Sequence, residues 1–282
     1  MAALTSGDLK SAAERINLPA GAVPPDRLFA RSVAAWVTGY IRRMQGNLPA
    51  AITAFKETLT LGRQMDNVWT MLSAAVDLGE VLRQSGRLAD AEAVYRQTLA
   101  TVAGSRSPNP GYLGRLKSFL SNLLLEKNEV AAAHALALEA VEQNRGWENP
   151  NHTAFGALVL ARVELARQDD DAVARALALV GETATRSTVM PHIQTAAQGL
   201  RVRQWLAQGR LAEAEAWAAG QQLEPPFDEE KLGRALFAAR VRRAVGDLAA
   251  ARRLLSQLES DARAGGKTNA LIEILVLQAL CE

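Results

Sequence analysis

Gly86–Ala91 reads GRLADA, and this short stretch decides how the rest of the chain is interpreted. A glycine is followed by a polar residue, then by an aliphatic residue, and five places after the glycine comes an alanine. Glycine readily adopts the left-handed backbone conformation that ends a helix. The small alanine allows a second helix to approach the first one closely. The stretch therefore predicts the turn of a helical hairpin.

The same pattern recurs at intervals of about 40 residues along the chain. The strong copies, each with an alanine five places later, begin at Gly7, Gly46, Gly86, Gly209 and Gly246. Two weaker copies begin at Asn128, with Ala133, and at Asp169, with Ala174. Gly39 and Gly79 precede two of the turns by seven residues, where we expect the two helices of a hairpin to touch.

These repeats predict an all-α fold. We expect a right-handed, TPR-like superhelical solenoid of about seven antiparallel helix pairs, forming a single helical-repeat domain over residues 1–282. The composition agrees, because the chain is rich in alanine and leucine and has only three Tyr and six Phe, whereas strands favour aromatic and β-branched residues. No stretch shows the period-two alternation of a strand.

Both ends of the sequence fall in the middle of a repeat. Gly7 has almost no helix before it, and residues 269–282 read as the first helix of a pair without its partner. Terminal repeats of a solenoid usually carry a polar outer face. Residues 272–280 are instead strongly apolar. We therefore expect a fragment of a larger protein whose last helix associates with another copy or frays.

Four stretches resemble one protein family. They are 122–133 (NLLLEKNEVAAA), 146–150 (GWENP) followed by 160–163 (LARV), 208–214 (QGRLAEA) and 272–279 (IEILVLQA). The chain resembles the MalT-like, TPR-like helical sensor region of the large ATP-binding LuxR-family transcriptional regulators. The resemblance covers nearly the whole chain and keeps the order of the motifs.

The resemblance implies a function in signal transduction. It implies a sensing and protein-interaction domain that binds a small-molecule inducer or a partner protein in its concave groove. That event would be relayed to the ATPase and helix-turn-helix domains of the same full-length chain, which lie outside these residues. An alternative is a stand-alone TPR scaffold that binds peptide segments of partner proteins.

Composition argues against several other classes. The formal net charge is +2, from 32 basic and 30 acidic residues, so we expect no direct nucleic-acid binding, which requires a clustered basic surface. No apolar run approaches the roughly 20 residues of a membrane-spanning helix, and the N-terminus lacks the pattern of a signal peptide. We expect a cytoplasmic protein with no membrane association. The single cysteine, Cys281, excludes an internal disulfide.

We expect no catalysis, no cofactor and no metal in this chain. Ala264–Thr268 (AGGKT) lacks the first glycine of a phosphate-binding loop, because Asp261 occupies that position. Asp169–Asp171 suits a helix N-terminus better than a cation site, because the spacing of a calcium loop is missing. The three histidines fall in different repeats. No nucleophile or carboxylate arrangement typical of an active site is present.

The first helix of each pair is expected to line the concave groove. Positions ten, six and three residues before a turn share one face of such a helix. The polar and aromatic residues at these positions are the candidate ligand or partner contacts: Trp36, Tyr40, Arg43, Glu80, Arg83, Asn122, Arg203, Arg240 and Arg243. Trp and Arg are common anchors in interfaces. For any single residue the alternative is structural, with Trp36 filling a gap between repeats and the arginines extending to solvent.

Overall fold

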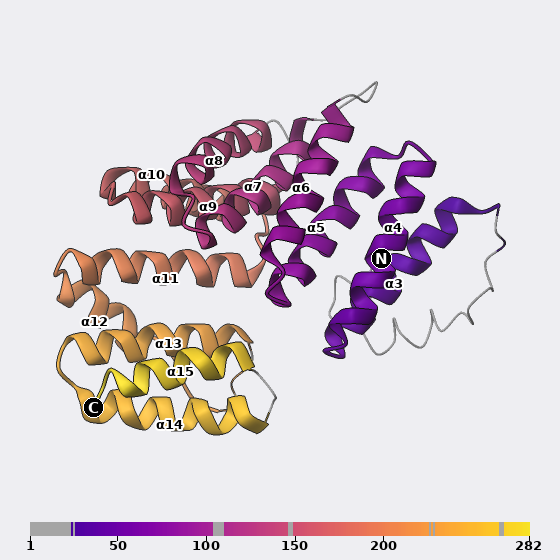
Figure 1. The fold of residues 1–282 in the computed structure, drawn as a ribbon. Helices are drawn as coiled ribbons and strands as arrows, with labels where there is room; N and C mark the ends of the chain where they lie inside the picture. The colour runs from indigo at the N-terminus through magenta and orange to yellow at the C-terminus, as the bar shows by residue number, and fades with distance from the viewer. Residues whose placement is uncertain are drawn as a thin grey trace. The chain divides into compact units, whose positions relative to one another are not determined.

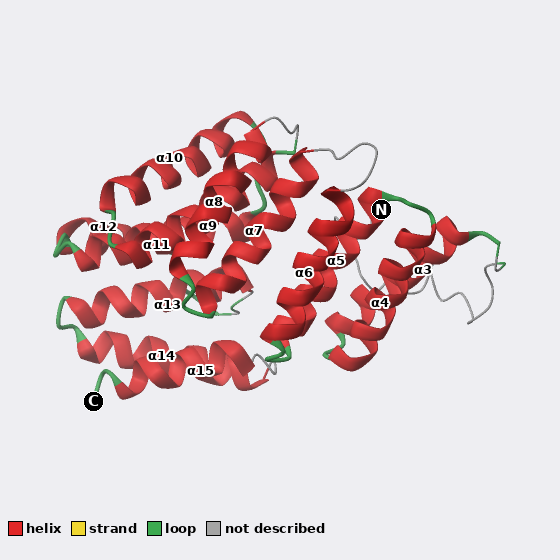
Figure 2. Ribbon diagram, turned by 45° about the horizontal axis from the view of Figure 1, so that its top comes forward, coloured by secondary structure: helices red, strands yellow, loops and turns green. Residues whose placement is uncertain are grey.

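The computed structural model describes residues 24, 26–103, 110–145, 149–225, 227, 229–264 and 268–282. Within these ranges all regular secondary structure is α-helical (Figure 2). The chain divides into two compact units, unit 1 (residues 1–147) and unit 2 (residues 148–282). Each unit is considered by itself.

Unit 1 contains six described helices that pack in sequence order (Figure 1). They are α3 (Leu28–Met44), α4 (Leu48–Gln64), α5 (Val68–Gln84), α6 (Leu88–Ala103), α7 (Pro110–Glu126) and α8 (Val130–Arg145). Helices α3, α5 and α7 also contact one another, α3 with α5 and α5 with α7. The first helices of successive repeats therefore lie side by side.

Unit 2 repeats this arrangement with seven described helices. They are α9 (Pro150–Arg167), α10 (Asp170–Arg186), α11 (Pro191–Ala207), α12 (Leu211–Ala219), α13 (Glu229–Ala244), α14 (Leu248–Ala264) and α15 (Thr268–Ala279). Here α9, α11, α13 and α15 form the row of first helices. The predicted all-α fold of stacked helix pairs is confirmed.

The predicted turns end their helices in the expected conformation. Gly46, Gly86, Gly209 and Gly246 all have positive φ angles, between 69° and 83°, and Asn128 adopts the same conformation at 62°. At the first of these turns the amide of Asn47 donates to the carbonyl of Arg42 at 2.9 Å, which satisfies a carbonyl at the helix end. The repeat predicted at Gly7 lies outside the described residues.

One turn was placed one residue too late. The left-handed residue between α9 and α10 is Gln168, with φ 61°, and not Asp169. Asp169 is instead the N-cap of α10, because its carboxylate accepts a hydrogen bond from the amide of Ala172 at 2.9 Å. The buried position of this repeat is consequently Val173, which is 0% exposed, whereas Ala174 faces solvent. The helix-capping interpretation of Asp169 is confirmed, and the alanine assignment is wrong.

Glycine allows the two helices of a pair to touch in unit 1. A Cβ atom added to Gly39 would lie 2.6 Å from the ring of Phe55, and one added to Gly79 would overlap the ring of Tyr95. Both rings are almost completely buried. The predicted contacts at Gly39 and Gly79 are confirmed. Each aromatic ring occupies the space that a side chain on the opposing helix would need.

The last helix exposes the apolar face that the sequence predicts. Ile272, Leu275, Val276 and Leu280 are between 42% and 58% exposed. Their spacing of three and four residues places them on one side of α15 and of the turn that follows it. The opposite side, with Ile274 and Leu277, is buried in the core of unit 2.

The close contact at Gly79 is testable by a matched pair of alanine substitutions. We expect Gly79→Ala to lower the free energy of unfolding by about 1–3 kcal/mol, because the new methyl group displaces Tyr95. Gly181→Ala on α10 is the control, since a Cβ there meets no atom within 4 Å, and the better helix propensity of alanine should stabilise it by up to about 1 kcal/mol. Urea denaturation followed by circular dichroism measures both. Equal stability of the two variants would refute the packing argument.

Candidate functional site

The candidate site begins with a buried carboxylate shared by two helices of unit 1. Asp77 on α5 is only 4% exposed. The indole Nε1 of Trp36 donates to its Oδ2 at 2.6 Å, and the hydroxyl of Tyr40 donates to its Oδ1 at 3.3 Å. Trp36 and Tyr40 lie one helical turn apart on α3, and their rings meet edge to face with centroids 5.0 Å apart. Asp77 therefore fixes the aromatic side chains of α3 against α5.

The electrostatics of this cluster extend to a third helix. Burial raises the pKa of Asp77, and this effect is opposed by Arg115 on α7, by the hydrogen bond from Trp36 and by Arg43 on α3. Burial, together with the charge of Asp77, raises the pKa of Tyr40 to about 12. Tyr40 therefore remains a neutral donor to Asp77 at physiological pH. The two arginines lie close enough to act on the carboxylate from both flanking helices.

The arginines of this face fall into two kinds. Arg83 is held between two carboxylates, with Glu80 at 2.5 Å on its own helix and Glu126 of α7 at 2.9 Å. The hydrogen bond with Glu80 is the main reason why the pKa of Arg83 is raised. Arg43 and Arg115, both half-buried, form no ion pair with any residue that the structure describes. The free hydrogen-bonding capacity of the face therefore lies in Arg43 and Arg115.

The nine predicted contact residues separate into two groups. Trp36, Tyr40, Arg43, Glu80 and Arg83 all belong to this face of unit 1. Asn122, on α7 of the same unit, is 8% exposed and offers little surface to a ligand.

The remaining three residues belong to unit 2. Arg203 on α11 and Arg243 on α13 are exposed. Arg240 forms an ion pair with Glu273 of α15 at 2.7 Å, so it contributes to packing between first helices. The three predicted residues of unit 2 are therefore surface or structural arginines. The polar cluster around Asp77 belongs to unit 1.

Sequence reasoning missed three members of the cluster. Asp77 stands in an otherwise apolar run of α5, which is the signal that could have identified it, since a buried carboxylate requires partners. Arg115 and Glu126 do not fall at the positions counted back from a turn, because facing side chains on neighbouring helices are offset along the helix axes. Only the packing of α3, α5 and α7 brings these residues together.

The described residues contain no group of three or more His, Cys, Asp or Glu side chains arranged to hold a metal ion. Cys281 is a free, buried thiol in the core of unit 2. Among the described residues no helix is long and apolar enough to cross a membrane.

A family comparison matches residues 2–281 to the sequence model of the MalT-like TPR region. This chain belongs to that family. No curated protein matches the sequence. TPR-like repeats form a scaffold and interaction fold, so the MalT-like TPR region described here is a helical-repeat interaction domain.

Solved structures support the fold of this MalT-like TPR region. The apo form of RapI has a TM-score of 0.61 at 11% identity, covering 100% of this chain and 93% of its own. BtubC (BKLC) from P. vanneervenii has a TM-score of 0.59 at 16% identity, covering 78% of this chain and 92% of its own. At such low identity the similarity extends to the fold alone.

The buried carboxylate predicts a pH-dependent stability. Because the pKa of Asp77 is raised above its ordinary value of 3.8, the folded chain binds this proton more tightly than the unfolded chain does. The resulting stability is fully present below the unfolded pKa and is lost as the pH rises through the folded pKa. Asp77→Asn should therefore gain stability relative to the natural chain as the pH rises from about 4 to about 8, measured by urea denaturation.

Trp36→Phe supplies the control for this assignment. It removes a hydrogen bond that lowers the pKa of Asp77, so the loss of stability should extend to higher pH. In the Asp77→Asn background the same substitution should leave the pH dependence unchanged. A pH dependence that survives in Asp77→Asn would assign the effect to other groups.

Proposed function

We propose that this MalT-like TPR region is the sensing domain of a LuxR-type, ATP-dependent transcriptional regulator. In this proposal it binds an inducer or a partner protein on the α3–α5–α7 face of unit 1 and relays binding to the ATPase and helix-turn-helix domains of the same full-length chain. The observation that carries the proposal is the cluster around Asp77, in which aromatic donors and two arginines without an ion pair to any described residue converge from three helices.

The cluster favours a ligand that has a polar or anionic group beside a flat or ring-shaped part. Arg43 and Arg115 can each present a planar fork of N–H donors to a carboxylate or phosphate. Trp36 and Tyr40 supply aromatic surface next to them. Such a combination binds both parts of a ligand at once.

The same contacts provide a route for the signal within unit 1. Asp77 connects α3 to α5, and Arg83 connects α5 to Glu126 of α7. A ligand that engages Arg43 or Arg115 changes the charge balance around Asp77 and with it the packing of α3 on α5. A binding event can thus alter the spacing of first helices, which is a mechanical change suited to transmission along a repeat array.

Thermal melting of the whole chain against a panel of oligosaccharides, amino acids, nucleotides and short peptides tests the proposal. A ligand that binds the folded chain raises the melting temperature in a dose-dependent manner. We expect Arg43→Gln or Arg115→Gln to reduce the shift strongly, because each removes a free guanidinium from the face. Arg42→Gln is the matched control, since Arg42 is exposed on the same helix and bonds Gln45 of the following turn.

A shift that persists in Arg43→Gln and Arg115→Gln would place the ligand elsewhere and remove the basis for this site. The regulator assignment has a separate test in the reading frame of the gene. It requires an ATPase encoded upstream and a helix-turn-helix downstream. Their absence would favour the alternative, a TPR scaffold that binds peptide segments of partner proteins.

The apolar face of α15 predicts self-association of this chain. Ile272 and Val276 are 58% and 55% exposed on one face, and burying such a face against a second copy is favourable at about 25 cal/mol per Å². We expect Val276→Glu to shift sedimentation towards the monomer without lowering the helical content. Arg253→Glu on exposed surface of α14 is the control. A concentration-independent monomer in the natural chain would contradict the prediction.

A further inference from the structure

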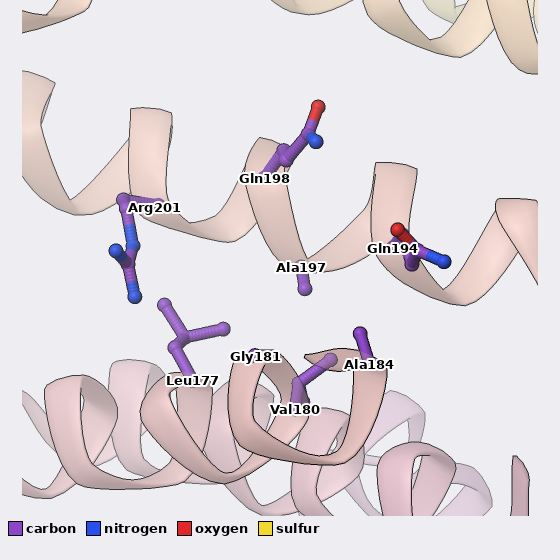
Figure 3. Close-up of a pocket in the computed structure, with 8 residues that line it drawn as sticks. All are labelled: Leu177, Val180, Gly181, Ala184, Gln194, Ala197, Gln198 and Arg201. Atoms are coloured by element: carbon purple, nitrogen blue, oxygen red, sulfur yellow. The ribbon is translucent and has the colours of Figure 1, made fainter. Parts of the chain in front are cut away.

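Unit 2 contains a hollow between two consecutive helices, neither of which belongs to the site in unit 1. It has a volume of about 210 Å³ and lies between α10 and α11. Figure 3 shows Leu177, Val180 and Ala184 rising from α10 towards Ala197 on α11. One end of the space is bordered by Gln194, whose Nε2 donates to the carbonyl of Val189 at 2.9 Å in the loop between the two helices.

Gly181 lines the hollow and carries no side chain that would fill it. Gly181 lies thirteen residues after the turn at Gln168, and a Cβ there would meet no atom within 4 Å. A glycine at a different repeat position in unit 1 is closed in: a Cβ on Gly62 of α4, sixteen residues after the turn at Gly46, would lie 3.1 Å from the backbone nitrogen of Met71 on α5. Gly181 therefore lies over open space, although a glycine in a helix interior costs roughly 1 kcal/mol relative to alanine.

The lining has an apolar floor and a cationic rim. Leu177, Val180 and the small residues around them form the floor. Arg201 on α11 extends towards Leu177 at one end of the space (Figure 3) and forms no ion pair with any described residue. Among the described residues, those that line the hollow include no carboxylate. Gln198, pointing away from α10, makes no hydrogen bond within the described part of the chain.

The size of the hollow decides what kind of group it admits. Pockets for drug-sized ligands have volumes of about 300–1,000 Å³, so this one holds a large side chain and not a whole ligand. A side chain reaches such a space from an extended peptide. The unpaired guanidinium of Arg201 complements a carboxylate beside the anchor.

We propose that the α10–α11 hollow is a docking site for an acidic peptide segment of a partner protein. The segment inserts one large apolar side chain over Gly181 and places an adjacent Asp or Glu on Arg201. This site is independent of the ligand face on α3, α5 and α7, so it does not rest on the function proposed for that face.

The test is selection of a displayed library of random 12-residue peptides on the whole chain, followed by fluorescence anisotropy with the selected peptides. We expect peptides with Leu, Met or Phe next to Asp or Glu. Gly181→Leu fills the hollow and should weaken binding at least ten-fold, whereas Gly181→Ala, which adds only a methyl group, should leave it within about two-fold. Arg201→Gln should weaken binding about ten-fold, and Arg203→Gln on the exposed part of the same helix should have no effect.

Each result has a defined meaning. Gly181→Leu is a valid probe only if its melting temperature is not lowered. If the melting temperature is lowered, Leu177→Ala, which enlarges the hollow, is the second variant. Selected peptides that bind Gly181→Leu as tightly as the natural chain, or the absence of any peptide that distinguishes the two, overturn the proposal. If the selected peptides have a large apolar residue without an acidic neighbour, and Arg201→Gln does not weaken their binding, the partner segment is not acidic and that part of the proposal is overturned. Dimerisation abolished by Gly181→Leu would make a second copy the occupant and overturn the peptide assignment.

Discussion

The close approach of paired helices is the constraint on which this structure depends. A helix pair cannot bury its apolar side alone, so each pair must contact its neighbours. Within two pairs of unit 1, the helices approach closely because a glycine on the first helix opposes a large aromatic ring on the second, as at Gly39 with Phe55 and Gly79 with Tyr95. Ala51 and Ala91, both 0% exposed, serve the same close packing near the turn.

Close packing has an electrostatic consequence on the other face of the first helices. Because α3 and α5 lie against each other, a carboxylate between them is removed from water, and burial of an ionised group is costly unless it is hydrogen-bonded. Trp36 and Tyr40 supply these bonds to Asp77. Buried charged groups often contribute no more to stability than well-packed apolar residues of similar volume would. Under the proposed function, the cluster serves binding as well as folding.

The repeat was predictable from the sequence because its signals are local. Glycine or asparagine at a turn, and alanine five residues later, are read from neighbouring residues, and five of the six turns lie where the spacing placed them. The sixth failed because three consecutive aspartates follow Gln168, and any of several residues there can end the helix. The N-cap of Asp169, rather than the turn type, fixes the register. This error of one residue assigned the buried position to Ala174, whereas the buried residue is Val173.

The candidate site was only partly predictable, because its members are related through space. Counting back from each turn identified Trp36 and Tyr40 correctly as neighbours, since both lie on one face of one helix. It did not identify Asp77 or Arg115, whose relation to them depends on how far α5 and α7 are displaced along their axes. The α10–α11 hollow is a still clearer case, because Gly181 reads as an ordinary small residue in sequence. The open space beside Gly181 is seen only in the structure, where the opposing helix does not approach this glycine as closely as α5 approaches Gly62. A glycine in a repeat protein thus has two opposite uses: it lets a neighbouring helix in, or it leaves a space for something else.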